Sequence, residues 1–279
     1  MIKTIDLTEG KQNNVYKYLS SAITPRPIAL VSTMDKNGNS NLAPFSFFNV
    51  FSINPPVLIF SPVTSIRNGK NKDTLENIKE TKECVIGIVT AKTAQQVSLA
   101  SCSFKKGVNE FNKAGFTEIS SDLIRASRIK ESPLNFECKV TKIEILGENG
   151  GAGNLVIAEI LKIHINTNIL DENGNIDPFK LDIVSRYGGN WYGKTTKESL
   201  YEIAKPISNV GMGMDNLPEE IKNSTILSGN ELAILASAEN IPLRKDFTQR
   251  NDKNLTEKHI LAKEFLSQGK IDDAWQILL

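Results

Sequence analysis

The strongest structural signal in this chain is the run Pro27-Ile28-Ala29-Leu30-Val31-Ser32-Thr33, followed by Asp35-Lys36-Asn37-Gly38-Asn39. The first run is short, apolar and rich in β-branched residues, so it predicts a largely buried strand. The Asn-Gly pair in the second run is typical of a hairpin turn, because both residues tolerate positive φ angles. We therefore expect an antiparallel hairpin whose return strand covers residues 40–48.

More strand-like runs follow this hairpin, with few helices between them. A break at Asn54-Pro55-Pro56 precedes the next strand, and residues 91–102, which include Cys102, read as a helix. Asp73 with Glu76 has the spacing of a capping box and predicts a short helix over 73–80. This pattern predicts a mainly β fold, a β-barrel or sandwich with flanking helices, and not a doubly wound sheet. The expected strands are 56–61, 83–90, 135–146 and 154–166.

The composition changes after Lys205, where helical patterns replace strands. Ser228 and Glu231 repeat the capping-box spacing, and Leu232, Leu235 and Ala236 form an apolar stripe at helical spacing. We therefore expect a first domain over residues 1–205 and a C-terminal helical extension over 206–279. The expected helices of the extension are 217–223, 228–238, 255–268 and 271–279.

Composition and charge exclude several classes of protein. Of the 279 residues, 33 are Lys or Arg and 32 are Asp or Glu, so the chain lacks the basic excess of a nucleic-acid-binding protein. Its apolar runs are far shorter than the ~20 residues of a transmembrane helix, and the N-terminus lacks a signal-peptide pattern. The three cysteines, Cys84, Cys102 and Cys138, are widely spaced and predict neither disulfides nor zinc. We expect a cytoplasmic protein.

The usual catalytic motifs are missing. The sequence has neither the G-x-S-x-G of a hydrolase nor a complete G-x-G-x-x-G after a strand. The two histidines lack the spacing of metal ligands, so no metal site is expected. Strict alternation along strand 154–166 places His164 on one face with Val156, Ala158 and Ile160, where a neighbour would satisfy it. His259 is expected on the solvated surface of the extension.

A polar and aromatic cluster lies between Asn41 and Thr74. Its first part, residues 41–49, combines phenylalanines with hydroxyl and amide groups. Its second part, residues 61–74, brings hydroxyls and cations directly before a helix N-terminus, an arrangement that suits a phosphate. Each part also has an ordinary explanation, as core packing or as a solvated loop. Together they favour a phosphorylated planar ligand, which the composition does not identify.

The order of these motifs resembles the flavin reductase family with the FMN-binding split barrel, and flavoredoxin within it. The resemblance rests on Arg26–Thr33, on the 41–49 motif and on Lys72-Asp73-Thr74. It continues through Glu131-Ser132-Pro133 and Phe136-Glu137-Cys138 to Arg186-Tyr187-Gly188-Gly189. It covers residues 10–205.

The resemblance implies a Greek-key split barrel, a homodimer and FMN near the dimer interface. It implies that His164 approaches the flavin from the partner edge as a catalytic residue. The capping-box spacing favours Asp73 as the helix cap over a contact with an anion. Cys102 reads as an ordinary helix residue and not as a redox thiol, because nothing fixed near it in the sequence would activate the thiol. The residues implied to hold FMN fall into two groups. Those implied to line the flavin ring and the ribityl chain are Ser46, Phe47, Phe48 and Asn49. Those implied to bind the ribityl-phosphate end are Ser61, Thr64, Arg67, Lys72 and Thr74. The residues implied to border the nicotinamide or substrate are Arg186 and Tyr187.

The function implied is that of an NAD(P)H:flavin oxidoreductase, in which hydride passes from NADH or NADPH to FMN. Two alternatives stay open. One is a flavoredoxin-like electron-transfer protein reduced by a protein partner, and the other is a flavin-binding module without enzymatic turnover. The sequence distinguishes neither NADH from NADPH nor bound FMN from FMN released as a product. An electron-transfer or monooxygenase partner protein is compatible with each enzymatic reading.

Overall fold

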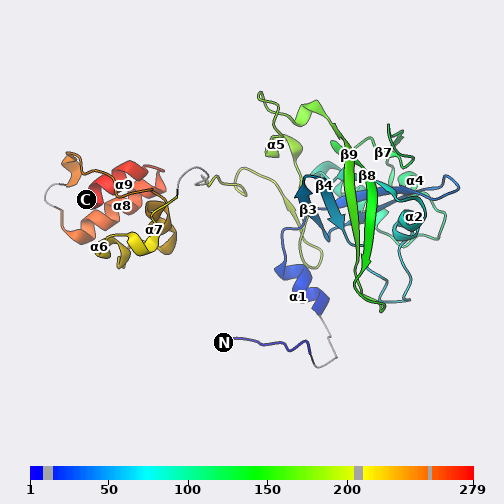
Figure 1. Cartoon of the computed structure of the whole chain (residues 1–279), viewed down its shortest axis with the longest axis horizontal. Coiled ribbons are helices and arrows are strands. Elements are labelled where there is room, and N and C mark those ends of the chain that lie inside the picture. The colour runs from blue at the N-terminus through cyan, green and yellow to red at the C-terminus, as the bar shows by residue number, and fades with distance from the viewer. Residues whose placement is uncertain (9–14, 204–209, 251–252) are drawn as a thin grey trace. The chain divides into compact units, whose positions relative to one another are not determined.

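A seven-stranded antiparallel sheet forms the centre of the N-terminal part of the chain (Figure 1). The computed structural model describes residues 1–8, 15–203, 210–250 and 253–279. The strand order is β2-β1-β5-β8-β9-β4-β3, and every neighbouring pair is antiparallel. The strands are β1 (Ala29–Met34), β2 (Ser40–Phe45), β3 (Phe48–Ile53), β4 (Pro56–Phe60), β5 (Glu83–Ile88), β8 (Leu134–Ile145) and β9 (Asn154–Ile165).

The two edges of this sheet are joined by a very short connection. β2 ends at Phe45 and β3 begins at Phe48, yet these strands are the first and last of the sheet. Because only Ser46 and Phe47 separate them, the sheet must curl until its edges approach. The edges do not pair, so the sheet is an open barrel with flanking helices. The expected hairpin of β1 and β2 is confirmed, but the single strand predicted over 40–48 is wrong because the chain leaves one edge at Ser46.

The barrel has an inner and an outer apolar layer. Ala29 and Val31 of β1 point into an inner core that also contains Phe60 and Val156. The alternate residue Leu30 belongs to an outer core against α3 (Ala94–Ala100) and α4 (Glu110–Ala114). The remaining elements of this part are α1 (Val15–Ala22), α2 (Asp73–Thr81), α5 (Pro178–Leu181), β6 (Glu118–Ile119), β7 (Arg128–Ile129), β10 (Val184–Arg186) and β11 (Tyr192–Lys194), with 3₁₀ turns at Ala91–Thr93 and Thr167–Ile169.

A β-bulge at Leu161 changes the direction of the side chains in β9. Cys138 pairs with Ile160 and Glu137 pairs with Lys162, so Leu161 is an extra residue in β9. Strict alternation therefore fails at this point. His164 shares its face with Lys162 and not with Val156, Ala158 and Ile160, which corrects the sequence-based placement.

The first residue of α2 is Asp73, and the N-cap position belongs to Lys72, which makes no side-chain capping hydrogen bond. The prediction that Asp73 caps this helix is therefore wrong by one position. Its carboxylate lies in the first turn, where a negative charge still stabilises the helix by interacting favourably with the helix dipole. The N-terminus of α2 has no side-chain cap of its own.

The chain divides into two compact units, unit 1 (Met1–Tyr201) and unit 2 (Glu202–Leu279). The boundary predicted at Lys205 lies in residues 204–209, outside the described residues. Unit 2 has a core of its own that contains Leu235, Phe265 and Trp275. Its helices are α6 (Glu219–Lys222), α7 (Gly229–Ala236), α8 (Leu255–Ser267) and α9 (Ile271–Leu278), with 3₁₀ turns at Met214–Asn216 and Thr248–Arg250.

Local signals explain the helices of unit 2. The capping box of Ser228 and Glu231 is confirmed, and a second one joins Asn254 to Glu257. His259 is only 4% exposed, and its Nδ1 lies 2.8 Å from the Ser224 hydroxyl. The expectation of a solvated His259 is wrong, because this residue lies on the inner face of α8. Burial lowers the pKa of His259, although the charge of Glu220 acts in the opposite direction. Among the described residues, no helix is both long and apolar enough to cross a bilayer.

Candidate functional site

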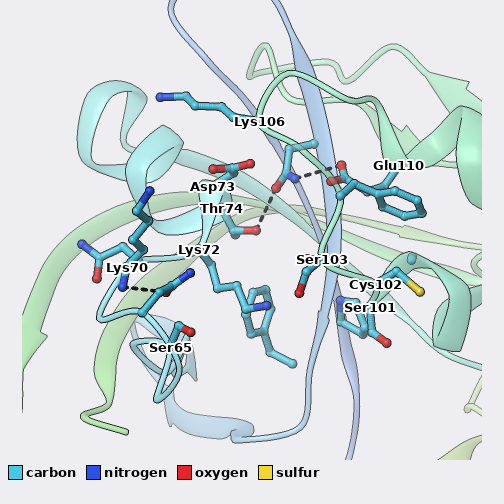
Figure 2. Close-up of a pocket in the computed structure, with 18 residues that line it drawn as sticks. Ser65, Lys70, Lys72, Asp73, Thr74, Ser101, Cys102, Ser103, Lys106 and Glu110 are labelled. Carbon is cyan, nitrogen blue, oxygen red and sulfur yellow. Dashed lines mark hydrogen bonds between the residues drawn. The ribbon is translucent and has the colours of Figure 1, made fainter. Parts of the chain in front are cut away.

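A cavity of about 470 Å³ lies between the N-terminus of α2 and the loop that follows α3 (Figure 2). The end of β2 forms one wall with Ala43, Pro44 and Phe45. Figure 2 shows Lys70 and Lys72 on one side of the space and Ser101–Ser103 on the other. Its volume lies within the ~300–1,000 Å³ of small-molecule sites. The segment that leads into α2 contributes Ser65, Asn68, Lys70, Asn71, Lys72, Asp73 and Thr74 to the lining. The end of α3 and the loop after it contribute Ala100, Ser101, Cys102, Ser103, Phe104 and Lys106.

The α2 side of the cavity is suited to an anion. Lys70, Lys72 and Lys106 are three cations in its lining. The backbone N–H groups of Asp73 and Thr74 start the helix and so have no intrahelical acceptor. A cation at the N-cap position opposes the helix dipole, whereas a bound anion would complement both the dipole and the lysines. The local sequence thus leaves this helix end open for a negatively charged group.

The polar floor of the cavity is held by a chain of buried hydrogen bonds. The Thr74 hydroxyl donates to Asn41 Oδ1 at 2.8 Å, and Asn41 Nδ2 donates to Glu110 Oε2 at 2.9 Å. The same carboxylate oxygen accepts the backbone N–H of Leu42 at 3.1 Å. Burial raises the pKa of Glu110, and the charge of Asp73 acts in the same direction, although the bonds from Leu42 and Asn41 oppose it. Glu110 thereby orients the Asn41 amide, which in turn orients the Thr74 hydroxyl at the cavity.

Cys102 lies at the opposite wall. α3 ends at Ala100, so this residue is in the loop beyond the helix and not in a helix as predicted. It is exposed, and Ser101 and Ser103 line the cavity beside it. Cys102 is therefore part of the cavity wall.

Three of the predicted phosphate ligands lie outside the lining. Ser61 Oγ accepts the backbone N–H of Asn154 at 3.1 Å, and Thr64 Oγ1 lies 3.3 Å from Asn154 Nδ2. Both residues are buried and attach the loop after β4 to the start of β9. Arg67 is exposed on the same loop, between cavity residues Ser65 and Asn68. Of the predicted phosphate ligands, the structure brings Lys72 and Thr74 into the cavity.

The predicted ring-contact residues occupy the junction of the two sheet edges. Ser46 follows directly after the cavity residue Phe45, and the Phe47 side chain is 39% exposed. Phe48 packs against the inner core, and Asn49 accepts the backbone N–H of Val50. None of these four residues is in the cavity lining. Ser46 and Phe47 are partly exposed where the chain leaves the cavity wall, whereas Phe48 mainly supports the barrel.

Arg26 contacts this junction, and Arg186 shares a hydrogen-bond acceptor with Arg26. Arg26 Nε lies 3.4 Å from Ser46 Oγ, and its guanidinium lies 5.9 Å from the ring centroid of Phe47. Tyr187 contributes its carbonyl oxygen, which accepts from Arg26 at 3.3 Å and from Arg186 at 2.9 Å. The predicted substrate residues Arg186 and Tyr187 are thus linked to the predicted flavin residues through Arg26.

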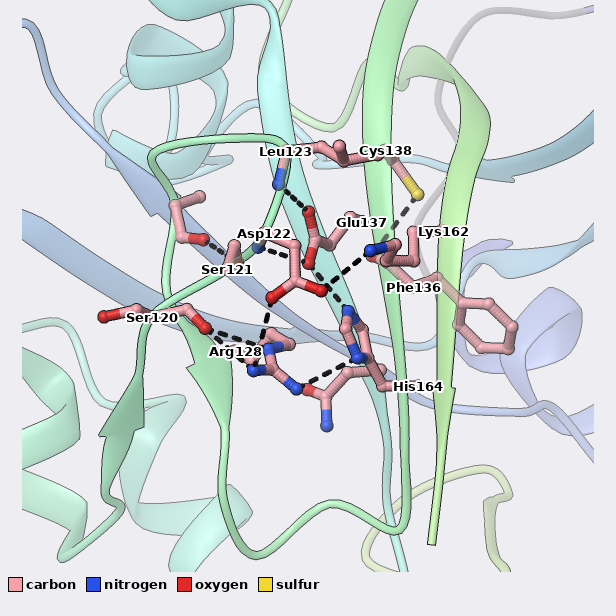
Figure 3. A network of polar contacts seen from close by, with 12 residues as sticks. Ser120, Ser121, Asp122, Leu123, Arg128, Phe136, Glu137, Cys138, Lys162 and His164 are labelled. Atoms are coloured by element: carbon pink, nitrogen blue, oxygen red, sulfur yellow. Dashed lines mark hydrogen bonds and ion pairs between the residues drawn. The ribbon is translucent and has the colours of Figure 1, made fainter.

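His164 lies elsewhere, in a charged network on the outer face of β8 and β9 (Figure 3). Its Nε2 is 2.7 Å from Glu137 Oε1, and its Nδ1 is 3.0 Å from Arg128 Nη1. Because a guanidinium only donates, Nδ1 must accept and Nε2–H donates to Glu137. Burial alone would raise the pKa of Glu137, but the N–H groups of Asp122 and Leu123 and the His164 imidazole lower it overall.

Asp122, Glu137 and His164 come close enough to suggest metal ligands. However, Lys162 Nζ lies 2.8 Å from one oxygen of Asp122, and Arg128 lies 3.8 Å from the other. Arg128 also occupies His164 Nδ1. Two cations therefore hold the positions that a metal ion would need, and we read the cluster as an ion-pair network.

Comparison with known proteins identifies the family. Residues 20–180 match the flavin reductase like domain. The chain belongs to this family. An uncharacterised protein of Aquifex aeolicus is 38% identical over 196 residues, which are 70% of this chain and 96% of that protein. The uncharacterised protein YwrF of Bacillus subtilis is 31% identical over 188 residues, 66% of this chain and 91% of its own length. The family match ends before unit 2 begins.

Solved structures of similar proteins agree with the family match. Nitrilotriacetate monooxygenase component B from Bacillus cereus is 28% identical with a TM-score of 0.67, over 73% of this chain and 99% of that one. The 2-nitrobenzoate 2-nitroreductase NbaA of Pseudomonas fluorescens is 27% identical with a TM-score of 0.63, over 75% and 100%. A flavoredoxin of Desulfovibrio vulgaris, 20% identical with a TM-score of 0.54, shares the fold. The expected resemblance to flavin reductases is therefore confirmed.

Sequence reasoning missed the contact of Asn41 with Glu110 and the loop of residues 101–106 at this site. Asn41 and Glu110 are 69 positions apart, and their contact depends on the packing of α4 against β2. The 101–106 loop carries the hydroxyl-rich Ser101-Cys102-Ser103 and two lysines, a pattern like that of residues 61–74, but the helix predicted over 91–102 includes its first two residues. That repeated combination of hydroxyls and cations was the available signal.

Proposed function

We propose that unit 1 binds FMN in the cavity and acts as an NAD(P)H-dependent flavin reductase. The observation that carries this proposal is the open N-terminus of α2, where Lys72 replaces a capping residue and faces the cavity. Three lysines match the phosphate, and Ala43, Pro44 and Phe45 offer an apolar wall to a ring. The residues present therefore fit FMN in charge, size and polarity.

Each wall has a distinct role in this proposal. Lys70, Lys72 and Lys106 would hold the phosphate together with the first N–H groups of α2. The Thr74 hydroxyl gives its proton to Asn41, so toward the cavity it would accept a hydrogen bond from a ribityl hydroxyl. Ser46 and Phe47 would border the ring. When bound, the flavin supplies hydride acceptance from a nicotinamide and delivery of electrons to an acceptor.

The relatives support an oxidoreductase and leave the acceptor open. One similar structure is a component of a monooxygenase and another is a nitroreductase. We accordingly propose that the reduced flavin serves either a small acceptor or a partner monooxygenase. A flavoredoxin-like protein reduced by another protein is the competing outcome of the test.

The direct test is a visible absorption spectrum of the purified protein after FMN loading and removal of excess. We expect a retained flavin spectrum that bleaches when NADH or NADPH is added without oxygen, and the faster nucleotide is the donor. Retained flavin that neither nucleotide bleaches would favour a protein electron donor. Absence of both retained flavin and turnover with free FMN would overturn the proposal.

The phosphate assignment has its own test, because riboflavin lacks the phosphate of FMN. We expect Lys72→Gln to weaken FMN binding about tenfold or more, the value of a lost charge-assisted hydrogen bond, and to leave riboflavin binding unchanged. Lys130→Gln removes the same charge from an exposed site outside the cavity and should affect neither ligand. Arg67→Gln tests the exposed cation of the loop in the same way. Equal loss of both ligands in Lys72→Gln would contradict the assignment.

We propose a homodimer, because large apolar side chains are exposed along the barrel. Val50, Phe51 and Ile53 of β3 are 53%, 64% and 83% exposed, and Ile163 of β9 is 49% exposed. Such surfaces on a globular protein mark contact sites. Sedimentation should give a dimer for the wild type and a monomer for Phe51→Asp. A monomeric wild type at micromolar concentration would contradict the proposal.

The sequence-based prediction that His164 is catalytic is untested, and the contacts of His164 argue for a structural role instead. Both of its ring nitrogens are engaged by Arg128 and Glu137, so we assign no proton transfer to it. His164→Gln should therefore retain flavin reduction within a few fold. A loss of more than about a hundredfold with FMN still bound would restore the catalytic assignment.

A further inference from the structure

Arg26 and Arg186 form a cationic pair without a carboxylate partner. Neither makes an ion pair with any acidic group in the part of the chain that the structure describes. By contrast, Arg125 pairs with Glu83 and Arg128 with Asp122. The charge of the pair is therefore not neutralised locally.

The partners of both guanidinium groups are neutral. Arg26, only 7% exposed, donates to the carbonyl oxygens of Ser20, Ile23 and Tyr187. Arg186 donates to the carbonyl oxygens of Tyr187, Gly189 and Trp191, and it lies 4.6 Å from the ring centroid of Tyr192. The two groups thus converge on one oxygen, that of Tyr187.

This convergence has an electrostatic cost, since two like charges approach each other and one of them, on Arg26, is buried. Burial lowers the pKa of Arg26 and so does the charge of Arg186, whereas Tyr16 acts in the opposite direction. Carbonyl dipoles hold the two cations in position without cancelling their charge. A structural clamp alone would be served as well by one arginine paired with a carboxylate.

Arg26 lies beside the residues proposed to border the flavin ring, and Arg186 is joined to Arg26 through the Tyr187 carbonyl oxygen. Arg26 contacts both Ser46 and Phe47, and Ser46 follows the cavity residue Phe45. A hydride transferred from a nicotinamide carries two electrons and one proton. The donor becomes the oxidised nicotinamide cation, and the acceptor ring gains one negative charge unless a second proton follows.

We propose that Arg26 and Arg186 stabilise this added negative charge and so raise the reduction potential of the bound flavin. The inference rests on the proposed FMN site. It assigns Arg186 an electrostatic role in addition to a border with substrate, and it brings Arg26 into the site as a residue that acts through charge and through the placement of Ser46 and Phe47.

The test is the reduction potential of bound FMN in charge-removing and charge-keeping variants. We expect Arg186→Gln and Arg26→Gln to shift the two-electron reduction equilibrium at least tenfold toward oxidised flavin, which is about 30 mV. Arg186→Lys and Arg26→Lys keep the charge and should retain most of the wild-type potential. Arg125→Gln is the matched control, since it removes one positive charge from an arginine that has its own carboxylate partner, and it should leave the potential unchanged.

The outcomes separate the roles. Equal shifts in the Lys and Gln variants would show that the guanidinium geometry matters and not the charge, which overturns the proposal. Unchanged potentials in every variant that retains FMN would overturn it as well, with the FMN site intact. If Arg26→Gln does not fold, the reduction potentials of the variants at the half-buried Arg186 decide the test alone. Failure of the wild type to bind FMN would overturn both this inference and the proposed function.

Discussion

Glu110 is the residue on which the floor of the cavity depends. Its carboxylate accepts from Asn41 and from the backbone of Leu42, and this fixes which end of the Asn41 amide faces Thr74. A buried carboxylate with only neutral donors is costly when ionised. The raised pKa of Glu110 expresses that cost.

We predict that Glu110→Gln gains stability relative to the wild type as the pH rises. The pKa of Glu110 is higher in the folded protein than the ordinary 4.5, so the folded state binds more protons between these two values. Its contribution to the unfolding free energy is full below the unfolded value and is lost as the pH rises through the folded value. Gln has no such dependence and keeps an oxygen that can accept from Asn41 and Leu42.

The measurement is urea unfolding of both proteins without FMN from pH 4 to pH 7.5. The difference in unfolding free energy should move in favour of Glu110→Gln across this range. A difference that is constant with pH would show that Glu110 titrates normally. Glu118→Gln is a suitable control, because the pKa of Glu118 is lowered overall, by hydrogen bonds from Ser40, Asn109 and Ser127 that outweigh burial.

At the residue scale, the sequence predicted the α2 side of the cavity better than its other walls. Lys72 and Thr74 lie in one short segment before a helix, so spacing alone brings them together. Asn41 and Glu110 meet only through tertiary packing, which no local pattern records. Ser61 and Thr64 had the right side chains for phosphate binding, but their bonds to Asn154 use these groups for structure.

At the element scale, the unusual feature is a nine-residue helix that begins at a cavity without a side-chain cap. Lys72 occupies the N-cap position with an extended backbone, at φ −73° and ψ 147°. Serine is strongly preferred at such a position and would satisfy one N–H group of the first turn. The lysine therefore costs helix stability in the absence of an anion.

We predict that Lys72→Ser stabilises the protein without FMN and weakens its binding of FMN. The new cap should raise the unfolding free energy by about 1 kcal/mol. Loss of the cation should reduce FMN affinity about tenfold. Chemical denaturation and flavin titration measure the two effects. Lys72→Ala is the control, because it removes the cation without providing a cap and should weaken binding without the gain in stability. A Lys72→Ser variant that binds FMN normally would show that helix and ligand do not compete for this position.

The strands show where pattern reading succeeds and where it fails. The apolar and β-branched runs predicted β5, β8 and β9 nearly to their ends. The bulge at Leu161 could not be predicted from the sequence of β9 alone, because a residue is an extra one only relative to the strand it pairs with, here β8. That single residue reversed the predicted face of His164 and placed it with Glu137.

At the scale of the whole molecule, the order of strands in the sheet could not be read from the chain. β2 and β3 are nearly consecutive in sequence and lie at opposite edges, so the barrel shape follows from a two-residue connection that resembles an ordinary strand interior. The resemblance to flavin reductases predicted a split barrel where local pattern left barrel and sandwich open. The resemblance to the family thus predicted the topology of the sheet, whereas local sequence patterns predicted the individual strands and helices.

The two tryptophans of the chain lie in different units, which makes the organisation of the molecule measurable. Trp191 of unit 1 is 77% exposed, whereas Trp275 of unit 2 is 1% exposed within its core. Because each unit has a hydrophobic core of its own, we predict two separate unfolding transitions. In a Trp191→Phe variant, the emission wavelength reports unit 2 alone, and release of flavin reports unit 1.

FMN should stabilise only one of these transitions. At about 100 times its Kd, the ligand should add about 2.7 kcal/mol to the stability of the unit that binds it. The transition seen by flavin release should therefore move to higher urea as the FMN concentration rises, while the emission shift of Trp275 stays at the same urea concentration. The two signals moving together would contradict the prediction, because it would mean that unit 2 unfolds only when the barrel does.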